Sequence, residues 1–161
     1  MTKGQLALKL VLEELGLTPE SGIRMMERSV YLAQVSGVPL SYSFGWHSSG
    51  PGSPSLTTDW VNLGNWTFGD PEWKGLVLRS STKEKIAKVL PLFEVPDDVN
   101  LTNEDWLELI SSVHYLKWVS GYSEEQINRF FIDVNYVTMY PFIERAKDIL
   151  KINGFWVKYE N

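Results

Sequence analysis

Apolar residues near the start of the chain recur three and four positions apart, which is the spacing of one face of an α-helix. Two stretches have this pattern, and the residues concerned are Leu8, Val11, Leu12 and Leu15, then Ile23, Met26, Val30 and Ala33. Gly16 ends the first stretch, and Gly37 and Pro39 follow the second, as expected after helix C-termini. The pattern therefore predicts two successive helices that pack their apolar stripes on a shared core.

A different pattern follows the second predicted helix. Aromatic residues alternate with small ones at Tyr42, Phe44 and Trp46, and an alternation of period two predicts a strand. The Gly-Pro-Gly run at 50–52 predicts a loop with a sharp bend directly after that strand. The bend places the polar run 47–49 where a functional site could lie.

A third helix is predicted to begin after this loop, because Ser53 can cap free backbone N–H groups and Pro54 has no N–H to lose. The apolar segment 73–78 is short enough to be a second strand. Ser81, followed three positions later by Glu84, has the capping-box pattern of a helix start. This order of helices and strands is compatible with a winged-helix-like arrangement, in which two strands flank the third helix.

The second half of the chain has helical periodicity throughout. A break rich in proline and aspartate precedes it, and we place the boundary at 95/96. Thr102 and Ser123 are the expected N-caps of two helices. The predicted fold class is mostly α (α+β): a winged-helix-like helical domain with a short β-hairpin at 1–95, followed by a helical C-terminal lobe packed on it at 96–161. A single domain is the alternative.

Composition narrows the class of protein. With 43% apolar and 22% charged residues among 161, the chain has the composition of a folded protein. No apolar run is long enough for a membrane span, and Lys9 interrupts the N-terminal apolar stretch, so a helix is expected there rather than a secretory signal. The chain has no cysteine, hence no disulfide or thiolate site, and a cytoplasmic location is expected.

Charge is unevenly distributed along the chain. The formal net charge of −5 counts against a general nucleic-acid binder. Basic residues are nevertheless concentrated in one segment, and acidic residues follow between positions 94 and 108. The basic residues are Lys74, Arg79, Lys83, Lys85 and Lys88. Such asymmetry indicates either a basic binding edge beside an acidic one or two solvated surfaces, and solvated surfaces are the commoner case.

His47 is the first candidate for chemistry, because serine hydroxyls lie within a few residues of its imidazole. No third group in the sequence is placed to orient the base, and the run does not match the Gly-x-Ser-x-Gly nucleophile elbow. Positions 45–50 have the glycine spacing of a phosphate-binding loop, but Pro51 stands where that loop needs a lysine. We therefore expect a structural turn at this point.

The remaining titratable residues give no stronger candidate. His114 and His47 are the two histidines, and neither belongs to a His-x-x-x-His pair, so no metal site is expected. His114 is instead expected to be partly buried and hydrogen-bonded. Adjacent carboxylates at 13–14, 97–98 and 124–125 fall at expected helix ends or in loops, where solvated acids are usual. The sequence predicts no catalytic residue and no cofactor. Of the aromatic residues, Trp46 is the one expected to be exposed.

A longer motif spans the second predicted helix and the central stretch. A basic residue precedes Val-Tyr-Leu-x-Gln, and Tyr-x-Phe, a histidine, Gly-Pro and Ser-x-x-Leu follow. The matching residues are Arg28, Val30, Tyr31, Leu32, Gln34, Tyr42, Phe44, His47, Gly50, Pro51, Ser53 and Leu56. In this motif the chain resembles the bacterial YwgA-type proteins and, more distantly, the Panacea antitoxin domain. Later segments, such as SEEQINRFF, are also similar to the YwgA pattern. One departure is Gly52, where the family commonly has an aromatic or aliphatic residue.

The resemblance implies a winged-helix-like domain from mobile-element, toxin–antitoxin or phage-related loci, without an agreed catalytic activity. The expected function is a non-enzymatic protein-interaction module, an antitoxin or regulatory partner, that binds a toxin, an effector or a phage-defence component. The expected partner-binding residues are Arg28, Tyr31, Trp46, His47, Ser49 and Pro51. The alternative is a DNA-binding transcriptional regulator that uses the basic segment from Lys74 to Lys88. Homo-oligomerisation is left open.

Overall fold

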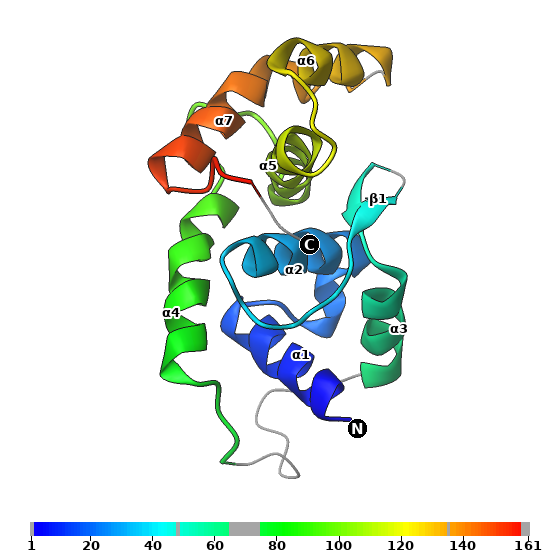
Figure 1. Ribbon diagram of the computed structural model, residues 1–161, viewed down its shortest axis with the longest axis vertical. Helices are drawn as coiled ribbons and strands as arrows, with labels where there is room; N and C mark the ends of the chain where they lie inside the picture. The colour runs from blue at the N-terminus through cyan, green and yellow to red at the C-terminus, as the bar shows by residue number, and fades with distance from the viewer. Residues whose placement is uncertain (1, 48, 65–74, 135, 159–161) are drawn as a thin grey trace.

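The computed structural model describes residues 2–47, 49–64, 75–134 and 136–158, which form seven α-helices, short 3-10 turns and one hairpin (Figure 1). The α-helices are α1 (Lys3–Glu14), α2 (Ile23–Val35), α3 (Pro54–Leu63), α4 (Ser80–Val89), α5 (Asn103–Trp118), α6 (Glu124–Asp133) and α7 (Ile143–Ile152). The 3-10 turns are η1 (Pro19–Ser21), η3 (Leu90–Phe93) and η4 (Tyr140–Phe142), and the strands are β1 (Gly45–His47) and β2 (Gly50–Gly52). The predicted mostly helical α+β class with a short hairpin is confirmed.

Capping residues explain where several helices begin. The hydroxyls of Ser53, Thr102 and Ser123 each accept a hydrogen bond from a backbone N–H in the first turn of α3, α5 and α6, so these predicted N-caps are confirmed. The prediction for Ser81 is wrong. It lies inside α4, whose N-cap is Arg79 and which has no side-chain cap.

The hairpin differs from its prediction. β1 pairs with β2 in antiparallel register, with Trp46 opposite Pro51. The Gly-Pro-Gly run is therefore a strand and not the predicted loop, and Tyr42 and Phe44 precede β1 instead of belonging to it. The sharp bend lies between the two strands.

The second predicted strand, at 73–78, is also not formed in the part of that segment that the structure describes. Gly75–Leu78 has no strand, and Trp73 and Lys74 lie outside the described residues. Within the described chain both strands consequently precede α3 and do not flank it.

The core is organised around α5, from which every residue between Trp106 and Leu116 is buried. α5 packs on α2 from the first half of the chain and on α7 from the second (Figure 1). A hydrogen bond of 2.9 Å from the Trp106 indole to the Leu92 carbonyl also joins the two halves. One cluster of buried apolar residues draws on both, so α5 connects the two predicted units directly.

Candidate functional site

Strand β2 lies against both α2 and α5, and all three of its residues are buried. Its glycines make this close approach possible. A Cβ on Gly50 would lie 2.6 Å from Nε of Arg28 and 3.1 Å from the Ser112 hydroxyl, and a Cβ on Gly52 would run into the Glu27 carboxylate. A glycine inside a strand often marks such close backbone packing. The same contact leaves no room for a larger residue at position 52.

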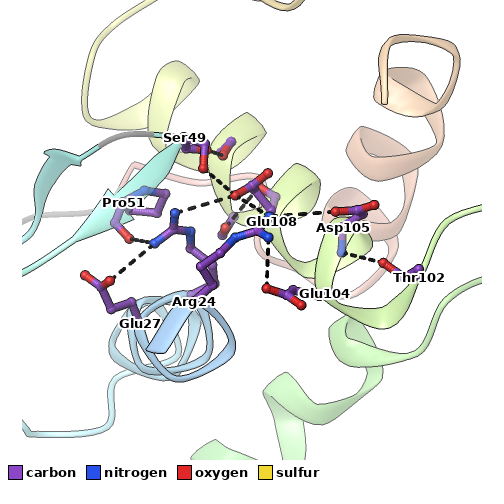
Figure 2. Close-up of polar contacts among 11 residues, drawn as sticks. Arg24, Glu27, Ser49, Pro51, Thr102, Glu104, Asp105 and Glu108 are labelled. Atoms are coloured by element: carbon purple, nitrogen blue, oxygen red, sulfur yellow. Dashed lines mark hydrogen bonds and ion pairs between the residues drawn. The ribbon is translucent and has the colours of Figure 1, made fainter. Parts of the chain in front are cut away.

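Three charged side chains hold the hairpin, and we call Arg28, Glu108 and Glu27 the hairpin clamp (Figure 2). Nη1 of Arg28 donates a hydrogen bond of 3.0 Å to the carbonyl of Pro51. Oε1 of Glu108 accepts one of 2.6 Å from the Ser49 hydroxyl. Oε2 of Glu27 accepts one of 3.2 Å from the backbone N–H of Ser53. The clamp therefore binds the bend, β2 and the first residue after it.

The clamp is buried and its charges are paired. Arg28 is only 3% exposed, and its guanidinium lies 3.6 Å from Glu108 and 3.8 Å from Glu27. Burial lowers the pKa of Arg28, and the two carboxylates oppose that shift. Removing one partner of a buried pair leaves an uncompensated charge, so each clamp residue depends on the others.

Arg24 extends the clamp to the surface, where it lies over the first half of α5 (Figure 2). Its guanidinium is 2.9 Å from both Glu108 and Glu104 and 3.7 Å from Asp105. Burial alone would lower the pKa of Arg24, but its hydrogen bond to Glu108 and the three carboxylate charges raise it above the ordinary value. Glu108 thus lies between two arginines, one buried and one partly exposed.

A second buried polar pair lies deeper. The Tyr31 hydroxyl and Nδ1 of His114 are 2.7 Å apart, and both residues are fully buried. Burial lowers the pKa of His114 to about 4, and the backbone of Val157 opposes that shift. The predicted hydrogen bond of His114 is confirmed, and the side chain is fully buried where partial burial was predicted. The imidazole is neutral at neutral pH, and Tyr31 packs edge-on against Phe44 at the base of the hairpin.

The predicted partner-binding residues divide into an inner and an outer group. Arg28, Tyr31 and Pro51 are buried and bonded within the protein, and Ser49 is half-buried with its hydroxyl on Glu108. His47 is exposed. The inner residues position the hairpin, and the outer ones are available for contact.

Trp46 is half-buried, so the prediction that it is exposed is wrong. Its ring packs against Tyr115 at 5.7 Å and edge-on against Phe130 of α6 at 5.2 Å. Trp46 thereby joins the hairpin tip to α6.

Large apolar side chains are exposed where α6 ends and in the segment that follows. We call Val134, Val137 and Tyr140 the α6 patch, and all three are exposed. Ile132 is also exposed, but it lies two positions from Val134 and lines a different side of α6 with Glu125, Asn128 and Arg129. Phe130 and Val134 are four positions apart and share a helix face, so the patch continues to the Trp46 contact. In the view of Figure 1 the end of α6 lies above the hairpin tip.

The predicted basic edge on α4 is divided between two sides of the helix. Arg79, Lys83 and Lys88 are exposed, Lys85 is half-buried, and Lys74 lies outside the described residues. Lys83 and Lys85 point in nearly opposite directions, because residues two positions apart on a helix do not share a face. The Lys85 side chain lies beside Gly37, and the Lys88 ammonium is 5.9 Å from the centre of the Phe155 ring.

Sequence reasoning missed Glu108, Glu27 and Arg24. The signal for Glu108 was a single charge between the apolar pairs Trp106-Leu107 and Leu109-Ile110, because a charge inside an apolar helical run is rarely buried without a partner. The α6 patch had the weaker signal of apolar residues on both sides of a helix end.

Among the described residues no group of His, Cys, Asp or Glu side chains is arranged to hold a metal ion. No helix in the described ranges is both long and apolar enough to cross a bilayer. The chain matches no family model, no curated protein and no solved structure.

Proposed function

We propose that this protein is a non-enzymatic interaction module that recognises another protein through the α6 patch and the hairpin tip beside it. The observation that carries the proposal is the exposure of three large apolar side chains within 134–140, among them Val137 at 65%. A contiguous exposed apolar surface on a folded domain commonly marks a protein contact. Trp46 and Phe130 extend this surface, and aromatic residues are frequent energetic centres of interfaces.

The hairpin clamp supports this proposal, because it fixes the tip before a partner binds. A loop that is already ordered loses less conformational entropy on association than a loose one. Ser49, Pro51 and Ser53 are all bonded to the clamp, so exposed His47 stands on a rigid base. We assign Arg28 and Tyr31 to positioning and His47 and Trp46 to contact.

The polar groups near the tip are engaged in structural bonds, which supports a role without catalysis. The Ser49 hydroxyl donates to the Glu108 carboxylate, which also pairs with two arginines, so both groups are engaged in holding the hairpin. His47 is exposed on the hairpin and does not lie in a deep hollow.

Charge suggests the kind of partner. Asp133 lies at the end of α6 beside the patch, and the chain carries a net charge of −5, so a basic partner would be attracted to the protein. With the resemblance to YwgA-type and Panacea proteins, we propose a toxin, an effector or a defence component, met in the cytoplasm.

The experiment is affinity capture from the source organism at physiological salt, with three forms of the chain. The test variant carries Val134→Asp and Val137→Asp, and the control carries Val61→Asp at an equally exposed apolar position on α3. We expect the wild type and the control to enrich the same protein and the test variant to lose it. A chain that captures nothing, or a test variant that captures the same protein, would refute the proposal.

The second candidate is DNA binding through α4, favoured by the exposure of Arg79, Lys83 and Lys88. It is the lesser proposal, because the bases of α4 lie on different sides and two of them pack beside other parts of the protein.

A further inference from the structure

A groove runs along the outer side of α1, at a distance from the hairpin along the chain. Its walls are α1, the loop 38–40 and the segment 76–79, and it ends at Thr82 of α4. Its volume is about 340 Å³. Sites for small molecules occupy roughly 300 to 1,000 Å³ and are mostly apolar with a few polar groups.

Helix α1 is apolar on two faces, and only one of them is needed for the core. Leu8 and Leu12 point into the core and are fully buried. Leu6, Ala7 and Leu10 are half-buried, and they line the groove instead. These three share a helix face with Lys3, because they follow it at spacings of three, four and seven positions. The core therefore leaves a second apolar stripe of α1 facing solvent.

The opposite wall is equally exposed. Leu76 is 49% exposed and Val77 is 74% exposed, and both line the groove. Exposed apolar side chains on two facing walls would lose contact with water if an apolar chain lay between them, at roughly 25 cal/mol for each Å² covered.

The charged residues among the described lining are Lys3 and Arg79, and both are positive. This is notable in a chain with five more acidic than basic residues, counted as 20 against 15. Arg79 is also the N-cap of α4, which has no side-chain cap, so the partial positive charge of that helix end adds to the side chain's own charge. The groove thus combines an apolar floor with positive charge on its rim, from Lys3 at the start of α1 and Arg79 at the start of α4.

We propose that this groove binds an amphipathic carboxylate of the fatty-acid type, with the acyl chain between α1 and Leu76–Val77 and the carboxylate at Arg79. A peptide fits less well, because it would bring backbone N–H and C=O groups against walls that offer them few partners. An acyl chain has no such groups. This site is independent of the α6 patch, so it can fail or succeed without affecting the proposed function.

The test is calorimetric titration of the full chain with dodecanoate below its micelle concentration, beside dodecyltrimethylammonium, which has the same chain length and the opposite charge. We expect dodecanoate to bind saturably at one site and the cation to bind at least about tenfold more weakly. Bound dodecanoate should shift the methyl NMR signals of Leu6 and Leu10.

Two variants test the charge and two test the wall. Arg79→Glu should weaken dodecanoate binding about tenfold. Lys88→Glu makes the same charge change on the same helix, outside the groove and about 14 Å from Arg79 at roughly 1.5 Å per residue, and it should leave binding within about twofold. Val77→Asp should weaken binding, and Val61→Asp, which is also exposed, should not. Equal binding of the two amphiphiles, equal effects of the paired variants, or no saturable binding would overturn the proposal.

Discussion

The hydroxyl of Ser49 donates a hydrogen bond of 2.6 Å to the carboxylate of Glu108, a residue 59 positions further along the chain. This bond joins the bend of the hairpin to the buried middle of α5. The same oxygen pairs with Arg24 and Arg28 from α2. One carboxylate therefore links three separate segments, and the position of the hairpin tip depends on it.

Replacement of Glu108 by Gln should destabilise the fold. The change keeps the size of the side chain but leaves Arg28 as a buried cation with Glu27 as its remaining charge partner. Breaking a buried pair by removing one charge costs about 3 kcal/mol, which urea unfolding would measure. Glu104→Gln removes a partly exposed partner of Arg24 and should cost less than about 1 kcal/mol. Equal losses in the two variants would contradict the assignment of Glu108 as the centre of the clamp.

Gly50→Ala tests the close packing of β2. The new methyl group would lie 2.6 Å from Nε of Arg28, a side chain that is buried and bonded to the Pro51 carbonyl, so it has little freedom to move. We expect a loss of about 1 to 3 kcal/mol in unfolding free energy, as for other overpacked sites.

The matched control is Gly45→Ala in the paired strand. A Cβ there would meet the His47 ring at no less than 3.6 Å, which is an ordinary contact. This variant should unfold within about 0.5 kcal/mol of the wild type. If Gly50→Ala were equally harmless, glycine would not be required for the approach of β2 to α2.

The helix starts and strand β2 show what could and could not be predicted from the sequence. The helix starts at Ser53, Thr102 and Ser123 were predictable because a cap bonds to residues only three positions away. β2 was not, because glycine and proline disfavour strands, and this strand is stabilised by contacts with the distant helices α2 and α5.

The candidate site was predictable in part for the same reason. The motif contained Arg28 and Tyr31, but not the fact that both side chains turn inward to Pro51 and His114. The exposure of Trp46 was misjudged because its partner Phe130 is far away in sequence. Local pattern indicated residues of the central stretch, and long-range packing decided whether their side chains face outward or hold the hairpin.

The free energy of unfolding should decrease on acidification, over a pH range that is set by the pKa of His114. Its pKa is about 4 in the folded protein, against 6.5 for an ordinary histidine. Between pH 4 and pH 6.5 the unfolded chain therefore binds a proton on His114 that the folded chain does not. This contribution is fully present above pH 6.5 and is lost progressively as the pH falls toward 4, by about 3 kcal/mol in total.

Urea unfolding of the wild type and of His114→Asn, each measured between pH 7 and pH 4, checks this. The variant should be less stable at pH 7, since it loses the bond to Tyr31, but it should lose less stability on acidification. Carboxylates titrate in both proteins, so the difference between the two slopes isolates the histidine. Parallel curves would show that burial does not hold His114 neutral.

The salt dependence of DNA binding separates the two proposed functions. If α4 contacts phosphates, log K falls with log salt at a slope of about −0.9 for each phosphate neutralised. Arg79 and Lys83 lie on one side of the helix, and Lys85 and Lys88 are turned toward Gly37 and Phe155. One approach therefore engages two bases, and we expect weak binding with a slope near −2 at most. Arg79→Glu with Lys83→Glu should leave capture of the protein partner unchanged, and Lys151→Glu, an exposed charge change on α7, is the control. A slope steeper than about −3 that disappears in the α4 double variant and persists in the control would assign the protein to DNA instead.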